Sequence, residues 1–146
     1  MTKFLGAVMV AAALVLAIVP VFTDCESDGK MLTTASGKLV SMKCHWTGIA
    51  EIAAAIPLAI GGLYALLGGR RKETTRFAAI IGVTSGAVAI LLPTVLIGTC
   101  GSATMTCNLL MRPTLLSAGI VAIVASTALF FVARDQELPV APAAAA

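Results

Sequence analysis

Four cysteines carry most of the chemistry that this sequence offers: Cys25, Cys44, Cys100 and Cys107. Cysteines exposed to an oxidising compartment form structural disulfides by default, and four cysteines allow three pairings. Thiol exchange of the kind carried out by quinone-linked, disulfide-forming membrane oxidases uses a Cys-x-x-Cys pair with a lowered thiol pKa. No two cysteines here stand three apart, so structural disulfides are favoured over redox chemistry.

Soft metal ligands gather around the same cysteines. Methionine, cysteine and histidine suit Cu(I), and no other cofactor is predicted. Against a copper site, disulfide formation would remove the thiolates. The candidate ligands are Met42, Cys44, His45, Met105, Cys107 and Met111.

One acidic residue, Glu51, falls inside an apolar stretch. Acids in a membrane span are rare and mark a partner or a pathway. On a helix that begins near Cys44, Glu51 shares a face with that cysteine, seven residues on. The sequence offers Arg112, at the start of another apolar stretch, as its counter-ion, so we expect an intramembrane Glu51–Arg112 ion pair.

The elements that carry these residues are apolar helices. Of the 146 residues, 59% are hydrophobic and 12% are charged, too little polar surface for a soluble domain. A membrane-spanning helix needs about 20 largely apolar residues. The sequence therefore predicts an all-α, four-helix transmembrane bundle over residues 1–134, followed by a disordered cytoplasmic tail at 135–146. The four predicted spans are 4–22, 47–67, 77–97 and 114–132.

The distribution of basic residues predicts the orientation of the chain. The loop between the second and third spans holds Arg70, Arg71, Lys72 and Arg76, and cytoplasmic loops collect positive charge. We therefore expect a multi-pass protein of the plasma (inner) membrane, with both termini in the cytoplasm and the cysteine loops outside. The bilayer is its expected surrounding, and nothing in the sequence is typical of nucleic acid binding.

The two halves of the chain resemble each other. Each reads as an apolar helix, a proline, a threonine, a cysteine, an outer loop, Met-x-Cys and a second apolar helix. Two tandem helical hairpins follow from this pattern, and the duplication favours the disulfides Cys25–Cys44 and Cys100–Cys107. In the longer outer loop, segments 30–34 and 38–42 flank Ala-Ser-Gly, which predicts a β-hairpin flap over the bundle.

The string Cys44-His45-Trp46-Thr47, followed by Glu51, resembles a family of small bacterial four-span membrane proteins catalogued as a domain of unknown function. The resemblance runs from the first span to the fourth and includes Cys100-Gly101 and Met105-Thr106-Cys107. It implies a bacterial plasma-membrane protein, sometimes encoded beside ABC-transporter subunits, and it brings no established reaction.

No pattern in the chain matches a specified catalytic site, so an enzyme is not favoured. The sequence favours a non-enzymatic accessory or interaction subunit near a transport system. Its expected protein partners are ABC-transporter subunits or a second copy of the chain. The alternative is a thiol-redox or copper-handling membrane protein that uses the outer Cys/Met/His cluster.

Overall fold

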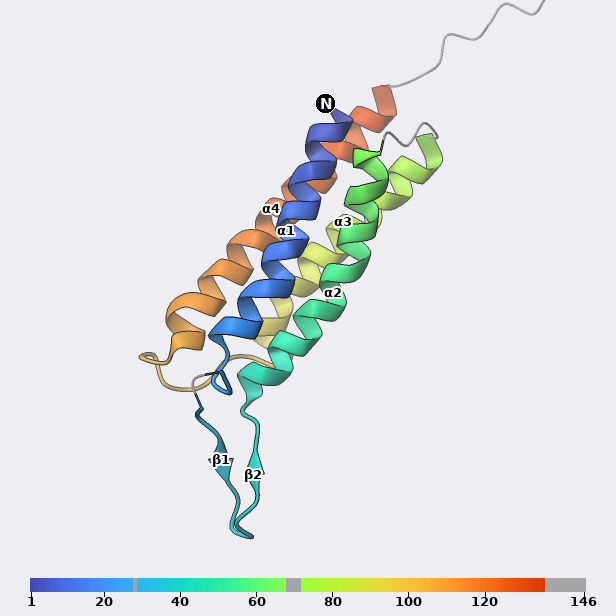
Figure 1. The fold of residues 1–146 in the computed structure, drawn as a ribbon. Helices are drawn as coiled ribbons and strands as arrows, with labels where there is room; N and C mark the ends of the chain where they lie inside the picture. Colours follow the sequence, from blue (N-terminus) through green and yellow to red (C-terminus); the bar gives the residue numbers. More distant parts are fainter. Residues whose placement is uncertain (28, 68–71, 136–146) are drawn as a thin grey trace, which may run out of the picture.

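Four long helices form a single bundle in the computed structural model, which describes residues 1–27, 29–67 and 72–135 (Figure 1). The helices are α1 (Thr2–Thr23), α2 (Lys43–Leu66), α3 (Lys72–Leu91) and α4 (Arg112–Asp135). One π-helical turn, η1 (Leu92–Leu96), extends α3, and another, η2 (Cys107–Met111), precedes α4. A two-stranded antiparallel hairpin, β1 (Leu32–Thr33) and β2 (Leu39–Val40), lies between α1 and α2.

All four helical segments are long and apolar enough to cross a membrane, which confirms the predicted bundle of four apolar helices. The helices extend beyond the predicted limits: the second begins four residues before the apolar run, and the third begins five residues before it. A helix can continue into polar residues at its ends, whereas hydropathy detects only its apolar part. The predicted tail after Asp135, together with Arg70 and Arg71, lies outside the described residues.

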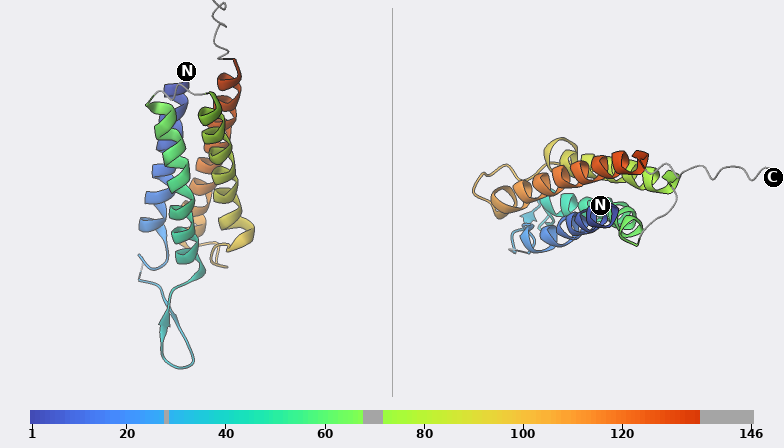
Figure 2. Two further views of the ribbon diagram at one scale, coloured as in Figure 1. Left: turned by 90° about the vertical axis from the view of Figure 1, so that its right-hand side faces the viewer. Right: turned by 90° about the horizontal axis from the view of Figure 1, so that it is seen from above.

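The bundle consists of two helical hairpins packed as two layers. One hairpin is α1 with α2, and the other is α3 with α4 (Figure 2). Each helix also packs against one helix of the other hairpin, α1 against α4 and α2 against α3. We call the end that holds the β-hairpin and the segments 24–43 and 97–107 the cysteine end. The opposite end, where α1 begins and α4 ends, is the basic end (Figure 1).

Small residues let the helices approach closely. A Cβ atom on Gly6 would lie 2.5 Å from the backbone nitrogen of Leu66 and 2.7 Å from the carbonyl oxygen of Gly62. Helix association in lipid depends on such backbone contact, because lipid chains are as apolar as the side chains that they would replace. A Cβ atom on Gly86, in the third span, would lie 2.9 Å from the carbonyl oxygen of Gly119. The glycines of the third span therefore serve packing within the chain.

The β-hairpin confirms the predicted strands but not their predicted position. Leu32 pairs with Val40 and Thr33 with Leu39, and Gly37 closes the turn at φ +78°, a value that favours glycine. The hairpin points away from the bundle along its long axis (Figures 1 and 2), and all residues from 29 to 40 are exposed. The prediction of a flap over the bundle is wrong, because the hairpin has no buried face to pack there.

Candidate metal centre

All four cysteines meet in one cluster at the cysteine end of the bundle. Their Sγ atoms all lie within 4.8 Å of one another. The Cys25 Sγ atom lies 3.4 Å from that of Cys100 and 3.6 Å from that of Cys107, and the Cys44 and Cys100 Sγ atoms are 3.4 Å apart. These close approaches all join one helical hairpin to the other. The cluster therefore links the two halves of the chain.

The ends of the helices position the sulfurs. Cys44 lies in the first turn of α2 and Cys107 is the first residue of η2, while Cys25 and Cys100 lie in the loops that follow α1 and η1. In η1 the carbonyl oxygen of Leu92 accepts hydrogen bonds from the backbone N–H groups of Ile97 and Gly98. Wide helical turns of this kind are common at functional sites.

The separations suit a single tetrahedral ion. Four thiolates around an ion at the Zn–S distance of about 2.3 Å stand about 3.8 Å apart, close to the separations observed here. A [4Fe–4S] cluster would spread its cysteines farther, because each cysteine would bind a different iron atom. The backbone N–H of Cys25 also points at the Cys44 Sγ atom, 3.4 Å away. A donor so placed stabilises a thiolate.

The predicted disulfides, Cys25–Cys44 and Cys100–Cys107, are not present in the structure. All four cysteines are free, and no sulfur contact is close to the S–S bond length of about 2.0 Å. The prediction favoured one bond within each hairpin over the two pairings that would join the hairpins. The fold instead places each cysteine beside cysteines of the other hairpin.

The cluster is buried except on one side. Cys44 and Cys107 are fully buried and Cys25 is 2% exposed, whereas Cys100 is half-buried. Burial, together with the neighbouring thiols of Cys44, Cys100 and Cys107, raises the pKa of the Cys25 thiol well above its ordinary value. A cation in the cluster would offset both effects, because it favours the charged thiolate.

The predicted soft ligands other than cysteine differ in where they lie. The Met42 thioether reaches the cluster, with its Sδ atom 3.8 Å from the Cys100 Sγ atom. Met111 is fully buried in the apolar core that includes the cysteines, and Met105 packs against that core. His45 is not among the ligands that converge on the cluster in the described part of the chain. Of the predicted soft ligands, Met42 therefore lies beside the cysteine sulfurs, whereas His45 lies outside the cluster.

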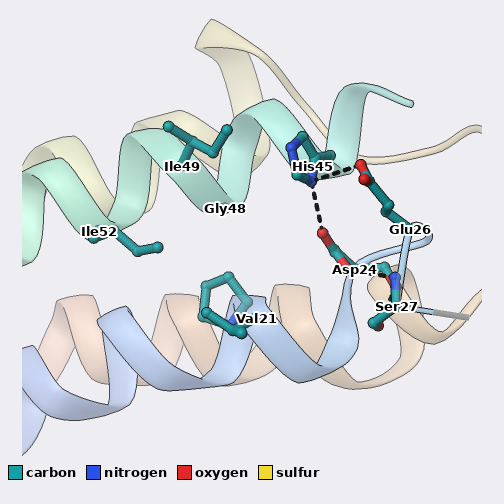
Figure 3. A pocket seen from close by; sticks show the side chains of 9 residues that line it. Val21, Asp24, Glu26, Ser27, His45, Gly48, Ile49 and Ile52 are labelled. Atoms are coloured by element: carbon teal, nitrogen blue, oxygen red, sulfur yellow. Dashed lines mark hydrogen bonds and ion pairs between the residues drawn. The ribbon is translucent and has the colours of Figure 1, made fainter. Parts of the chain in front are cut away.

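His45 instead binds two carboxylates beside the cluster (Figure 3). Its Nδ1 atom lies 2.9 Å from Asp24 Oδ2 and 3.1 Å from Glu26 Oε2. Burial alone would raise the pKa of Asp24, but hydrogen bonds from His45 and Ser27 hold it below its ordinary value. These residues line a cavity of about 280 Å³, and Trp46 is largely exposed next to His45. The carboxylates fix the position of the loop that carries Cys25.

The second hairpin has the corresponding contact at the same place. In the first hairpin the residue before Cys25 contacts the residue after Cys44. In the second, Thr99 Oγ1, just before Cys100, donates to Oδ1 of Asn108, just after Cys107, at 2.5 Å. The Asn108 side-chain amide also donates to the carbonyl oxygens of Cys100 and Ser102. The duplication of the sequence is therefore repeated in the polar contacts that position the cysteines.

Sequence reasoning missed the roles of Asp24 and Thr99. The repeat itself contains the signal, because Asp24 and Thr99 precede equivalent cysteines while His45 and Asn108 follow equivalent ones. Aligning the two halves would have paired these positions. Their contact across each loop depends on how each hairpin folds.

Glu51 is fully buried in α2, seven residues or about two turns after Cys44 and on the same helix face, as predicted. Neither of its carboxylate oxygens has a hydrogen-bond partner among the described residues, and Arg112 is exposed at the rim of the cysteine end. The predicted Glu51–Arg112 ion pair is therefore wrong. Arg112 is the first residue of α4, and an exposed cationic side chain at a helix end needs no buried partner. Thr47, one turn nearer the cluster, is fully buried and donates from Oγ1 to the Gly98 carbonyl oxygen at 2.7 Å.

The model of a protein family described as a domain of unknown function (DUF4418) matches residues 6–132. Comparison with curated proteins and with solved structures gave no match. The matched range includes all four cysteines, the whole of α2 and α3, and most of α1 and α4.

Proposed function

This chain belongs to the DUF4418 family, a domain of unknown function. We propose that this member of the family is a membrane protein that binds copper(I) through its four-cysteine cluster. The observation that carries the proposal is the convergence of the four Sγ atoms within 4.8 Å of one another. Two separate structural disulfides would not require the two hairpins to bring their cysteines together. One ion with four sulfur ligands does require it.

The donor set favours a soft ion. Every atom that converges on the site is sulfur, and the Met42 thioether adds a fifth sulfur beside Cys100. Thiolate ligands suit Cu(I), Zn²⁺ and iron–sulfur clusters alike, whereas harder ions take carboxylates and water, and the nearby Met42 thioether favours Cu(I) among the three. The nearest carboxylates, on Asp24 and Glu26, are engaged with His45. Zinc is the competing ion, because it also accepts four thiolates.

The proposal includes the orientation of the chain. The excess of Lys and Arg in the loop between α2 and α3 favours an orientation with the basic end in the cytoplasm and the cysteine end outside. A copper-bound cluster is then compatible with an oxidising compartment, because coordination to the ion protects the thiolates from oxidation to disulfides. A reporter that is active only outside the membrane, fused after Asp135, should be inactive. An active reporter there would reverse the orientation without affecting the metal site.

The accessory role beside a transport system stays a prediction. It is compatible with copper binding, since a copper site at the membrane surface could serve a transporter. No contact in the described residues bears on an ABC-transporter partner.

The direct test is anaerobic titration of the reduced, detergent-solubilised protein with Cu(I) against a competing chelator. We expect one ion per chain, with thiolate-to-metal absorption in the ultraviolet. Each single variant, Cys25→Ser, Cys44→Ser, Cys100→Ser and Cys107→Ser, should weaken binding strongly. Trp46→Phe alters an exposed side chain two residues from Cys44 and should bind like the wild type.

A double variant separates the metal site from structural disulfides. Cys25→Ser/Cys44→Ser removes one predicted disulfide and would leave the other intact, so the disulfide interpretation expects half of the crosslinks to remain. The metal interpretation expects this variant and Cys25→Ser/Cys107→Ser to lose copper equally. Absence of Cu(I) binding by the fully reduced wild type, or binding unchanged by all four single variants, would refute the proposal. Tight one-to-one binding of zinc in place of copper would refute the choice of ion.

A further inference from the structure

The outer surface of α3 and α4 at the basic end carries an amphipathic groove. Its apolar part is a cavity of about 260 Å³ between the two helices, lined by side chains such as Val83, Thr84 and Phe131. Its polar part is a cavity of about 590 Å³ that includes Arg76 and Glu73. Both parts are lined by Ile80 and Phe130, so they form one continuous groove.

Arg76 lies at the junction of the two parts. Its guanidinium carbon is 5.8 Å from the centre of the Phe130 ring, close enough for a cation–π contact that fixes the group in place. Its Nε atom is buried without a hydrogen-bond partner among the described residues. Among the described residues it pairs with the acid Glu73, whose carboxylate is 3.9 Å from Nη1 and 88% exposed. An exposed pair at that distance contributes little, so the guanidinium keeps most of its capacity for an anion.

The position along the helix matches the level of lipid headgroups. Arg76 is four residues after the start of α3, about 6 Å along the axis, while the apolar part of the groove continues toward the middle of the bundle. Lys72 lies one turn earlier on the same helix face and adds a second cation at the same end. A cationic end joined to an apolar groove between membrane helices complements one anionic headgroup and one acyl chain.

We propose that this groove, which we call the Arg76 groove, binds one anionic phospholipid. The guanidinium of Arg76 would bind the phosphate, for which its planar geometry is suited, and an acyl chain would lie between α3 and α4 past Ile80 and Thr84. The proposal depends on neither the copper site nor the orientation of the chain. The groove and the cysteine cluster are at opposite ends of the bundle (Figure 1).

The test measures lipid retained by the purified full-length protein. The protein is exchanged into mild detergent with equal amounts of phosphatidylglycerol and phosphatidylcholine of identical acyl chains, and bound lipid is counted by native mass spectrometry. The wild type should retain one phosphatidylglycerol in preference to phosphatidylcholine. Arg76→Gln should reduce that preference about tenfold, the loss of one strong charge-assisted contact.

Two variants complete the test. Arg112→Gln removes the same charge from the exposed rim of the cysteine end and should leave the preference unchanged. Thr84→Phe, at an exposed groove position, should block the acyl chain and lower retention of both lipids, and it tests the groove even if Arg76→Gln fails to fold. Excess inorganic phosphate should not displace the lipid.

Three results would overturn the proposal. An unchanged preference in folded Arg76→Gln would show that the guanidinium does not bind the headgroup. An equal loss in Arg112→Gln would show that only the net charge matters. Displacement by free phosphate, or full retention in Thr84→Phe, would show that the groove holds no acyl chain.

Discussion

Replacing Glu51 by leucine should stabilise the protein. Glu51 is fully buried in α2, and its two carboxylate oxygens have no hydrogen-bond partner among the described residues. Glutamate and leucine have similar helix propensity, so the change acts on the side chain alone. Leucine would fill similar space with no polar atom to satisfy.

The expected size of the effect follows from the missing partner. An unsatisfied buried polar group costs about 1–3 kcal/mol, and replacing it by an apolar group of similar shape removes that cost. A buried ion pair would give the opposite sign, because removing one partner destabilises by about 3–5 kcal/mol. The sign of the change therefore distinguishes an unpartnered acid from a bridged one.

Thr47→Val is the matched control, one turn away on the same buried face. It removes the hydroxyl that donates to the Gly98 carbonyl oxygen at 2.7 Å and leaves that oxygen without its donor. We expect it to lower the free energy of unfolding by about 1 kcal/mol.

Reversible unfolding in mixed detergent micelles, followed by circular dichroism, measures both variants under the same conditions. A Glu51→Leu variant that is less stable than the wild type, to the same extent as Thr47→Val, would show that the carboxylate has a stabilising partner and would refute the prediction. Glu51→Gln should lie between leucine and the wild type, because it removes the ionisable group but keeps an unsatisfied polar group.

Three further predictions concern packing and the cluster. Gly6→Ala should destabilise the bundle by about 1–3 kcal/mol, because its Cβ would collide with the α2 backbone. Gly61→Ala, whose Cβ would lie 3.2 Å from the Ala78 carbonyl oxygen and so needs a smaller shift, should destabilise less in the same unfolding assay. Asn108→Ala removes the side chain that holds the Cys100 carbonyl oxygen and should weaken copper binding roughly tenfold in the chelator competition; unchanged affinity would contradict this positioning role. In the reduced, metal-free protein, a maleimide should label half-buried Cys100 faster than fully buried Cys44, as peptide mass spectrometry would show, and equal rates would indicate that the cluster is open.

The architecture could be predicted because each span can be recognised from its own residues. About 20 apolar residues in a row specify a membrane helix without reference to any other segment, and the same holds for the turn at Gly37 in the β-hairpin. The helix ends were less predictable. Residues such as Lys43 and Lys72 begin helices here although hydropathy places them in loops.

The candidate site could be predicted only in part, because it depends on how the two hairpins pack. The sequence identified the four cysteines and Met42, and the repeat showed which cysteines are equivalent. It did not show that Cys25 would lie 3.4 Å from Cys100, since that contact joins residues 75 positions apart. The ion pair from Glu51 to Arg112 failed for a related reason. Both residues lie toward the cysteine end, but shared depth in the bundle does not determine which way a side chain points.

The position of the cluster has a mechanical consequence for the bundle. An ion held there would join the two helical hairpins at one end only, so any relative movement between them becomes a rotation about the ion. A helix such as α2, with 24 residues, is about 36 Å long, and a rotation of about 5° would move its far end by about 3 Å. Small adjustments of the metal ligands would thus be amplified at the opposite membrane surface, where a bound lipid or protein could detect whether the ion is present.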